Sequence, residues 1–473
     1  MKKYRIVVVG GGAAGIVTAM GAAGMGFSVA LVEKSRIGGE CSWTGCIPSK
    51  ALLAAAKKLH TINTAGKWGI TVTDTIVTTG IMGKVQELRQ RAAERAQTRT
   101  LLEKAGVEIF FGEPRFINEK ELDINGTRIS GQDFVIATGS SPVRSKNIGL
   151  ENVPYYTNQD IFEIQDIPES MGIIGGGPIG VEMAQAFCRL GSKVNLFHSG
   201  SNILPKDDTE LTGRLAEILE QEGIEFNLTS RVQNLTQENN RITIMAQNSA
   251  GTIINKSVAA LLIAVGRQCN VENLDLEKIG IHFTSKGIDV NKYLQTTIPH
   301  IWACGDCIGK YQFSHIAEIE ARTVLQNILL PVKQKINYKG IPWATFTEPE
   351  LAHLGITQKE AEEKGIKHQV YRQSMSLIDR AIVEQEDQGM IKIIADPHGK
   401  ILGAHILATN AAELLNELLL AMNANNGLTK ISSLPHVYPS WGYGLQRAAD
   451  HWLLDLRKRW YVEFGLELLR RFS

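Results

Sequence analysis

The sequence predicts an α/β protein with two Rossmann-like dinucleotide-binding domains, followed by a separate α+β domain. Three observations support this prediction. Strand and helix patterns alternate over the first 330 residues, which is typical of parallel sheets covered by helices. Two glycine-rich strand–turn–helix units lie near residues 6–33 and 171–198. From about residue 341, adjacent strand patterns are followed by a helical run at 411–423, which indicates an independent domain.

The composition is that of an ordinary globular protein. The 473 residues suffice for roughly three domains. The 50 basic and 49 acidic residues leave a net charge of +1, which argues against binding to nucleic acid. Hydrophobic residues at 44% and charged residues at 21% exclude a disordered chain. The 45 glycines exceed the roughly 33 that average usage would give.

Residues 6–32 carry no charged side chain and follow two lysines, so a signal peptide is one interpretation. Seven of these 27 residues are glycine, however, and each glycine weakens a helix by about 1 kcal/mol. The strand-like runs 6–9 and 28–32 frame a glycine-rich turn and a small-residue helix. We therefore favour a buried strand–helix–strand unit and expect a cytoplasmic protein.

The first glycine-rich turn has the spacing of a dinucleotide-binding loop. Gly10, Gly12 and Gly15 form a GxGxxG pattern between the strand and the helix. Such glycines permit a tight turn, close approach to a pyrophosphate, and close packing of helix on strand. Glu33 follows Gly15 by 18 residues, where an acid binds the ribose hydroxyls. A dinucleotide site is predicted here rather than a merely structural turn.

The second turn repeats the pattern with Gly175, Gly177 and Gly180, but the same offset leads to His198 instead of an acid. Loss of the carboxylate favours a 2′-phosphate, yet no arginine lies nearby to bind one. Lys206 and a protonated His198 are the candidate cations, and an exposed strand-end histidine is the other interpretation of His198. The sequence therefore leaves both NADH and NADPH as the expected nicotinamide cofactor. Two such sites in one chain indicate a flavin and a nicotinamide.

Cys41 and Cys46 lie just after the first unit and directly before a helical run at 50–59. A cysteine at a helix N-terminus has a lowered pKa and reacts as a thiolate. In a reducing compartment such a pair is more often catalytic than structural. The sequence therefore predicts a redox-active pair rather than two buried, unlinked thiols.

The run Gly38-Gly39-Glu-Cys41-Ser-Trp-Thr-Gly-Cys46-Ile-Pro-Ser-Lys50 resembles the signature of the flavoprotein (pyridine nucleotide) disulfide oxidoreductases. This family includes dihydrolipoamide dehydrogenase, glutathione reductase and mercuric reductase. The resemblance covers about residues 4–450. Further matching motifs are Ala137-Thr138-Gly139, Ala264-Val265-Gly266-Arg267, Ala303-Cys304-Gly305-Asp306 and Phe346-Thr347-Glu348-Pro349-Glu350.

The resemblance implies a homodimer that binds FAD and NAD(P)H. It implies an FAD-binding domain at 1–150 and 281–340, an NAD(P)-binding domain at 151–280 and an α+β dimerisation domain at 341–450. Residues 451–473 would form an extension. No metal site is expected, and Cys304 and Cys307, although spaced as CxxC, are expected to be packing residues within the flavin motif.

The same resemblance implies roles for individual residues. Cys46 would be the thiol that faces the flavin, and Cys41 the thiol that meets the acceptor. Lys50 would lie near the flavin N5 atom, with Glu182 as its partner. Asp306 would bind the ribityl chain, and Gly139 and Gly266 belong to the strand-end motifs of the two cofactor sites.

One departure from the family concerns proton transfer. Members that reduce disulfides carry a catalytic histidine and a glutamate near the C-terminus, where this chain has Tyr438 and Tyr443. A phenol titrates near pH 10 and is a poor proton shuttle at neutral pH. His436, two residues away, is an alternative proton donor, although a plain loop histidine is the preferred interpretation of it.

The Tyr438 position favours a mercuric-reductase-like enzyme. The chain lacks, however, the C-terminal cysteine pair of mercuric reductases, because no cysteine follows Cys307. The acceptor is therefore expected to be an unidentified metal ion or small-molecule disulfide. The alternatives are a dihydrolipoamide-dehydrogenase-type reductase and a membrane-associated NAD(P)H:quinone electron-transfer flavoprotein.

Residues 450–473 predict an amphipathic helix. Its apolar face comprises Leu453, Leu456, Trp460, Phe464, Leu468 and Phe472. Flanking basic residues would allow peripheral contact with an anionic membrane, but the segment's net charge is only +1. Packing on the protein or across a dimer is therefore favoured.

Overall fold

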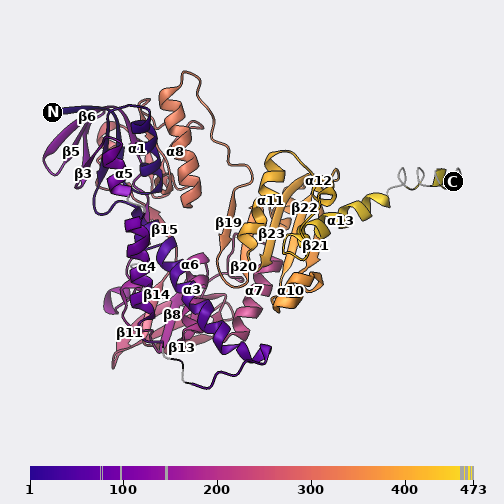
Figure 1. Ribbon diagram of the computed structural model, residues 1–473. Coiled ribbons are helices and arrows are strands. Elements are labelled where there is room, and N and C mark those ends of the chain that lie inside the picture. Colours follow the sequence, from indigo (N-terminus) through magenta and orange to yellow (C-terminus); the bar gives the residue numbers. More distant parts are fainter. Residues whose placement is uncertain are drawn as a thin grey trace. The chain divides into compact units, whose positions relative to one another are not determined.

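A computed structural model describes residues 1–74, 76, 78–95, 98–143, 148–458, 463, 467, 468 and 470. The chain divides into two compact units, which are described one at a time (Figure 1). The first unit contains residues 1–175, 233–244 and 256–337. The second contains residues 176–232, 245–255 and 338–473.

The first unit is built on a seven-stranded sheet. Its strand order is β3-β2-β1-β6-β5-β4, with β18 beside β6. The bounds are β1 Lys2–Val9, β2 Val29–Glu33, β3 Val107–Phe111, β4 Pro114–Asn118, β5 Glu121–Ile124, β6 Thr127–Ile136 and β18 Ile301–Ala303. Strands β1, β2, β3, β6 and β18 run parallel, whereas β4, β5 and β6 pair antiparallel. The predicted parallel α/β sheet is confirmed.

Helices cover one face of this sheet. They are α1 Ala13–Gly24, α5 Thr98–Lys104 and α8 Ser314–Leu329. Ile6 and Val8 of β1 pack into the core with α1 and α8, and the alternate residues Val7 and Val9 pack into the core on the other face. Because both faces are buried, β1 is apolar throughout Ile6–Val9, as strands of parallel sheets are.

The remaining elements of the first unit surround the cofactor motifs. The helices are α2 Gly39–Trp43, α3 Cys46–Asn63 and α4 Ile81–Arg95. Strands β8 Ser170–Ile174 and β14 Ala260–Ile263 pair parallel, and β7 Ser140–Pro142 and β15 Arg267–Cys269 pair antiparallel. Strands β16 Phe283–Thr284 and β17 Gly287–Ile288 form a short hairpin. Three further strands contain residues of both units: β11 Ser230–Glu238, β12 Arg241–Asn248 and β13 Ile253–Val258.

The second unit begins within the second glycine-rich turn. It contains α6 Pro178–Arg189, β9 Lys193–Phe197, α7 Thr209–Gln221 and β10 Glu225–Asn227. Strands β9 and β10 pair parallel.

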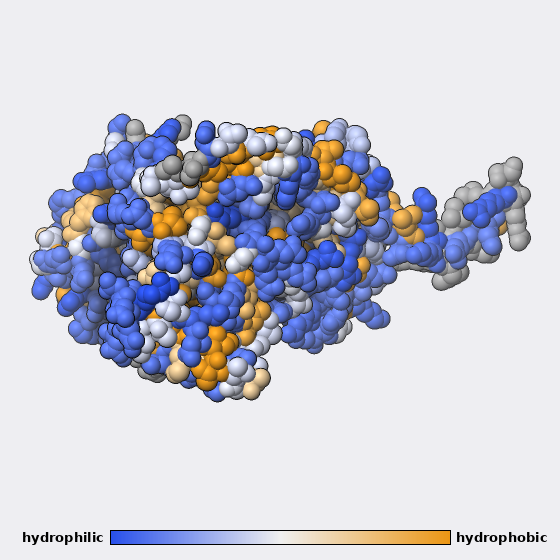
Figure 2. Space-filling view, turned by 90° about the horizontal axis from the view of Figure 1, so that it is seen from below, coloured by the Kyte–Doolittle hydropathy of each residue, from blue (hydrophilic) through white to orange (hydrophobic). Residues whose placement is uncertain are grey.

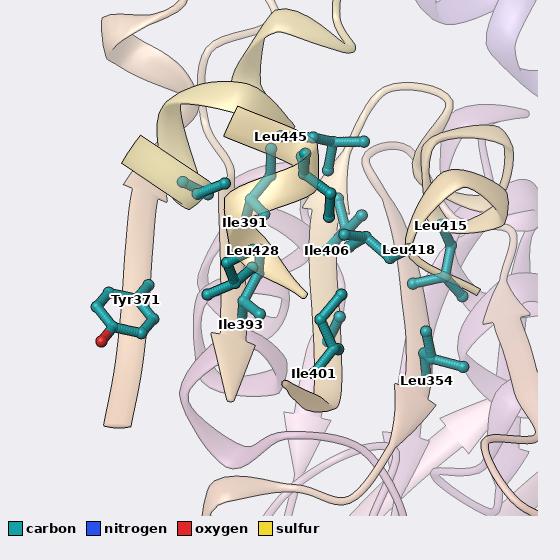
Figure 3. Close-up of a cluster of buried hydrophobic side chains, with 14 of the residues drawn as sticks. Leu354, Tyr371, Ile391, Ile393, Ile401, Ile406, Leu415, Leu418, Leu428 and Leu445 are labelled. Carbon is teal, nitrogen blue, oxygen red and sulfur yellow. The ribbon is translucent and has the colours of Figure 1, made fainter. Parts of the chain in front are cut away.

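The C-terminal part of this unit is a five-stranded antiparallel sheet with helices, which confirms the predicted α+β pattern. The strands, in the order β19-β20-β23-β22-β21, are β19 Pro342–Thr345, β20 Glu350–Gly355, β21 Gln369–Ser374, β22 Met390–Ala395 and β23 Ile401–Ala408. The helices are α9 Gln358–Glu363, α10 Asp379–Glu384, α11 Ala411–Asn423, α12 Leu428–Ser433 and α13 Tyr443–Arg457. Figure 3 shows the core between sheet and helices, where Ile391 and Ile406 pack with Leu418 and Leu445.

The last helix begins earlier than its apolar pattern predicts, at Tyr443. Leu453 and Leu456 pack against the core of the second unit, as expected for a helix that packs on the protein. Trp460, Phe464 and Phe472 lie outside the described residues, and Leu468 is 41% exposed.

Hydrophilic residues cover much of the face in Figure 2, with hydrophobic side chains exposed between them. Within the described part of the chain, every helix is too short or too polar to span a bilayer.

Candidate active site

The first glycine-rich loop connects β1 to α1. Gly10 has a φ of +111°, and a methyl group added there would lie 2.2 Å from the carbonyl oxygen of Ala137. A methyl group at Gly15 would lie 1.8 Å from the Gly10 carbonyl, so the helix packs closely on the loop. Gly12 is the N-cap of α1, and a methyl group added there would have only the Gly39 Cα atom within 4 Å, at 3.9 Å. The backbone N–H groups of α1 are therefore accessible to a phosphate.

Glu33 ends β2 and faces this loop. Its Oε2 atom accepts a hydrogen bond from the Gly11 backbone N–H at 2.7 Å, and Oε1 accepts from the Ser35 N–H at 2.8 Å. Oε1 also accepts from the Ser35 hydroxyl at 3.2 Å, so one of the about four acceptor positions of the carboxylate is left for a ribose hydroxyl. Glu33 thus holds the loop by hydrogen bonds, and its role toward a dinucleotide stays a prediction.

The other two motifs of the expected flavin site follow β6, which is a neighbour of β1, and β18, which is a neighbour of β6. Val9 is in register with Ile136 of β6, and Ile136 with Ala303 of β18. Because these strands are parallel, Gly10, Gly139 and Asp306 follow their carboxyl ends at one edge of the sheet, where ligands bind in such folds. Gly139 has a φ of +73°, and a methyl group there would find no described atom within 4 Å.

Asp306 is held by its neighbours. Its Oδ2 atom accepts a hydrogen bond from the Ser140 hydroxyl at 2.5 Å, and Arg267 lies 3.8 Å away. Burial raises the pKa of Asp306, and these two partners oppose that rise. Gly305, just before it, donates its backbone N–H to the buried Glu320 at 2.6 Å. The loops at this sheet edge thus fit a dinucleotide flavin, with open space at Gly12 and Gly139 and an oriented carboxylate at Asp306.

The two cysteines follow β2 in the sequence and belong to two consecutive helices. Cys41 belongs to α2, and Cys46 is the first residue of α3. The helical run was expected to start at Lys50, but α3 begins four residues earlier because Pro48 is accommodated in its first turn. Both residues are free thiols in the structure. Cys46 therefore lies at the positive end of α3, with Lys50 one turn further on.

The surroundings divide the pair into a thiolate and a thiol. A hydrogen bond from Cys41 is the main cause that lowers the pKa of Cys46, to about 6, and the Ser314 hydroxyl and the Lys50 charge lower it further against the effect of burial. The same bond to Cys46, together with burial, raises the pKa of Cys41 far above its ordinary value. Negative charge is thus stabilised on Cys46, while Cys41 stays protonated.

The second glycine-rich loop repeats the first in its backbone. Gly175 has a φ of +125°, and a methyl group added there would lie 2.2 Å from the carbonyl oxygen of Ala264. Gly177 is the N-cap of α6, and Gly180 is buried in that helix. Added methyl groups at Gly177 and at Gly266 would meet no described atom within 4 Å. These glycines fit the approach of a second dinucleotide.

His198 follows β9 and contacts this loop. Its Nδ1 atom accepts a hydrogen bond from the Gly176 backbone N–H at 3.3 Å. Burial lowers the pKa of His198, so the ring is neutral at physiological pH. The alternative of an exposed strand-end histidine is wrong, because the ring is partly buried and its Nε2 atom is shielded from solvent.

Glu182 is a buried residue of α6. Its Oε1 atom accepts a hydrogen bond from the Phe346 backbone N–H at 2.9 Å. Gln185 and Arg189, on the same face of α6, bind the next part of that segment: the Gln185 amide exchanges two hydrogen bonds with the backbone of Glu348, and Arg189 pairs with the Glu348 carboxylate. Gln185 and Arg189 were not predicted from the sequence, since no local pattern connects them to Glu348.

The C-terminal loop residues have polar partners. Tyr438 is 63% exposed, and its hydroxyl donates to Asp379 at 2.9 Å, which raises the pKa of the phenol. His436 lies 3.0 Å from both Glu417 and the Leu434 carbonyl, one at each ring nitrogen. Both ring nitrogens of His436 thus face oxygen atoms of neighbouring residues.

The CxxC cysteines Cys304 and Cys307 lie in the core of the first unit. Cys304 and Cys307 are buried, and the Cys307 thiol donates to carbonyl oxygens of Ile136 and Cys304. Within the described ranges, no three His, Cys, Asp or Glu side chains are grouped to hold a metal ion.

Comparison with known proteins identifies the family. The model of the pyridine nucleotide-disulphide oxidoreductases matches residues 4–321, and the model of their dimerisation domain matches residues 341–449. A mercuric reductase of Streptomyces lividans is 32% identical over 467 residues, covering 96% of this chain and 97% of that protein. A dihydrolipoyl dehydrogenase of Bacillus subtilis is 32% identical over 433 residues, covering 88% and 92%.

A solved structure is similar over nearly the whole chain. The Cu(II) complex of the HOCl-induced flavoprotein disulfide reductase RclA from Escherichia coli superposes with a TM-score of 0.86 at 29% identity, covering 95% of this chain and 100% of that one. The predicted family, fold class and cofactors are confirmed. The chain belongs to the pyridine nucleotide-disulphide oxidoreductases, enzymes that bind FAD and use NAD(P)H, and it carries the dimerisation domain of that family.

Proposed function

We propose that this protein uses NAD(P)H and FAD to reduce a Cys41–Cys46 disulfide, and that the resulting pair of thiols then reduces a soft metal ion or a disulfide while the Cys41–Cys46 disulfide forms again. The observation that supports this proposal is the unequal pair of sulfurs. Cys46 lies at a helix N-terminus with a lowered pKa, and Cys41 beside it holds a proton. Residues 1–150 and 281–340 would bind FAD, and residues 151–280 would bind NAD(P)H.

The bound cofactors supply the two electrons that open the disulfide. The protein then has to place one negative charge and one proton. The Cys46 thiolate takes the charge at the N-terminus of α3, and Cys41 takes the proton. Cys41 loses that proton when its sulfur engages the acceptor, because the thiolate is the reactive form.

The loop around Tyr438 favours a metal acceptor over a disulfide. Reduction of a disulfide releases a thiolate that must be protonated, so it benefits from a proton shuttle. Tyr438 keeps its proton because Asp379 raises its pKa, and both nitrogens of His436 are engaged. A soft metal ion needs no proton donor and binds thiolates well. The mercuric reductase relatives and the Cu(II) complex of RclA support this choice.

We infer that the active protein is a homodimer. Besides the match to a dimerisation domain, the C-terminal part of the second unit exposes apolar side chains that a partner would cover. Leu377, Leu420 and Val437 are 73%, 70% and 79% exposed. Tyr438, next to Val437, would then lie at the subunit interface and help to orient an acceptor at the partner's cysteine pair.

Anaerobic reduction with NADH or NADPH tests the proposal. The wild-type holoenzyme should develop a long-wavelength absorption band of a thiolate against the flavin. Cys41→Ser should abolish reduction of mercury(II) and copper(II), whereas Cys188→Ser, a change of a cysteine outside the pair, should leave it intact. A protein without flavin, or one that reduces every acceptor equally well as Cys41→Ser, would contradict the proposal.

The acceptor screen separates the alternatives. Turnover with lipoamide or glutathione disulfide but not with metal ions would overturn the preference for a metal. Turnover with quinones that survives Cys41→Ser would indicate the electron-transfer flavoprotein that bypasses the cysteines.

A further inference from the structure

Ser314 lies beside the cysteine pair although it is 268 residues from Cys46 in sequence. It is the first residue of α8, and its Oγ atom lies 3.8 Å from the Sγ atom of Cys46. Cys46 is itself the first residue of α3. The N-termini of two helices, of 18 and 16 residues, therefore meet at one sulfur atom.

Neither helix end is neutralised by its own sequence. The first turns of α3 and α8 contain no acidic residue, and their N-cap residues, Gly45 and Phe313, offer no side-chain cap. The partial positive charge of both ends is thus directed at the space that Cys46 and Ser314 share. Among the described groups that lower the pKa of Cys46, Lys50 is the one cationic side chain. The two helix ends add positive potential at the same sulfur.

The Ser314 hydroxyl is a suitable donor to this sulfur. A serine hydroxyl donates one hydrogen bond and can rotate toward whichever neighbour carries negative charge. Hydrogen bonds to charged acceptors are the strong ones. Cys41 is the main donor to the Cys46 thiolate, but Cys41 must leave that bond when its sulfur engages the acceptor. Ser314 also forms a hydrogen bond to Cys41 that lowers the pKa of that thiol, but its hydroxyl does not have to leave the site when Cys41 binds the acceptor.

We infer that Ser314 is a positioning residue that holds the negative charge on Cys46 during the part of the cycle in which Cys41 is bound to the acceptor. This inference rests on the proposed disulfide chemistry. Its consequence is that the contribution of Ser314 is small while the Cys41 thiol donates to Cys46 and large once that donor is gone.

The Cys41→Ala holoenzyme isolates this state. It cannot form the disulfide and it lacks the Cys41 donor, so Cys46 ionises beside the oxidised flavin without any nicotinamide. The pH dependence of the long-wavelength absorption band reports this ionisation. Adding Ser314→Ala should raise the apparent pKa of the band by about one to two pH units, since a charged hydrogen bond is lost. Ser314→Thr, which keeps the hydroxyl, should restore the value of Cys41→Ala.

The outcomes separate the role of Ser314 from the proposed disulfide chemistry. Flavin content and thermal unfolding are measured first, so that a misfolded variant is recognised, and Ser314→Thr then serves as the folded comparison. Coincident titrations of Cys41→Ala with and without Ser314→Ala would overturn the role of Ser314 alone. If Cys41→Ala shows no such band at any pH and keeps its reductase activity, the disulfide chemistry itself is wrong.

Discussion

The two glycine-rich loops share one backbone design and differ in a single acceptor. Gly10 and Gly175 both have positive φ, and a methyl group on either would lie 2.2 Å from the carbonyl oxygen of an alanine after another strand. In each loop the next glycine donates its N–H to a side chain 22 residues later. That acceptor is the carboxylate of Glu33 in the first loop and the imidazole of His198 in the second.

The difference shows which part of the motif shapes the loop and which part selects the ligand. Glycines determine where the backbone approaches the cofactor. The acceptor at the strand end supports the loop in both cases, since Glu33 and His198 occupy corresponding positions. Only Glu33 adds a negative charge, and one of its about four acceptor positions is left by the Gly11 and Ser35 donors. Burial lowers the pKa of His198, and its Nδ1 atom already accepts from Gly176, so position 198 supplies no carboxylate.

The largest expected effect comes from the paired substitutions Gly10→Ala and Gly175→Ala. Each forces a side chain into a positive-φ position against a carbonyl oxygen, a strain of about 1–3 kcal/mol before the clash is counted. Gly10→Ala should lose most of its bound FAD. Gly175→Ala should keep FAD but be reduced by NAD(P)H about 10- to 100-fold more slowly. Flavin absorbance per protein and rapid-mixing kinetics measure both. Equal loss of flavin from the two variants would show that the loops are not independent.

Glu33→Gln removes the charge from the first loop and keeps its size. Hydrogen bonds to a charged group contribute about 1.5–3 kcal/mol, so FAD should bind roughly 10- to 150-fold more weakly. Release of flavin fluorescence on dilution gives the affinity. His198→Gln is the matched change in the second loop and should leave FAD affinity unaltered. Unchanged FAD affinity in Glu33→Gln would mean that Glu33 only supports the loop.

His198→Glu makes the second loop resemble the first. The new carboxylate should repel a 2′-phosphate and accept from a 2′-hydroxyl, which lowers the ratio of kcat/KM for NADPH to that for NADH. A differential interaction of about 1.4 kcal/mol corresponds to a tenfold change in this ratio. Steady-state kinetics with both nucleotides measure it. A ratio that stays constant in His198→Glu, while His198→Gln also matches the wild type, would place the ribose end of the nucleotide away from position 198.

Patterns within single elements were predictable from the sequence. The expected helix at Ala411–Asn423 is present with the same bounds, because local periodicity and flanking turns define it.

Contacts between distant elements were not predictable. The positions of Glu33 and His198 were predicted by counting from the two glycine motifs. This counting works because strand and helix lengths in a strand–helix–strand dinucleotide motif are nearly constant. Ser314 beside Cys46, and Gln185 beside Glu348, join residues separated by 268 and 163 positions, so no spacing rule connects them. The neutral state of His198 also depends on burial, which one sequence does not show.

The smallest expected effect is the absence of a pH response at His198. A histidine titrates at about pH 6.5 when unperturbed, and burial lowers the pKa of His198 further, so the neutral ring dominates from about pH 7.5 to 8.5. The NADPH to NADH ratio of kcat/KM should therefore stay nearly constant over this range, and the non-titrating variant His198→Gln should give the same curve. If His198 instead carried a proton to bind a 2′-phosphate, the wild-type ratio would rise several-fold as the pH falls through its pKa, while His198→Gln would not respond. That result would make the second loop a charged site like the first, with the opposite sign.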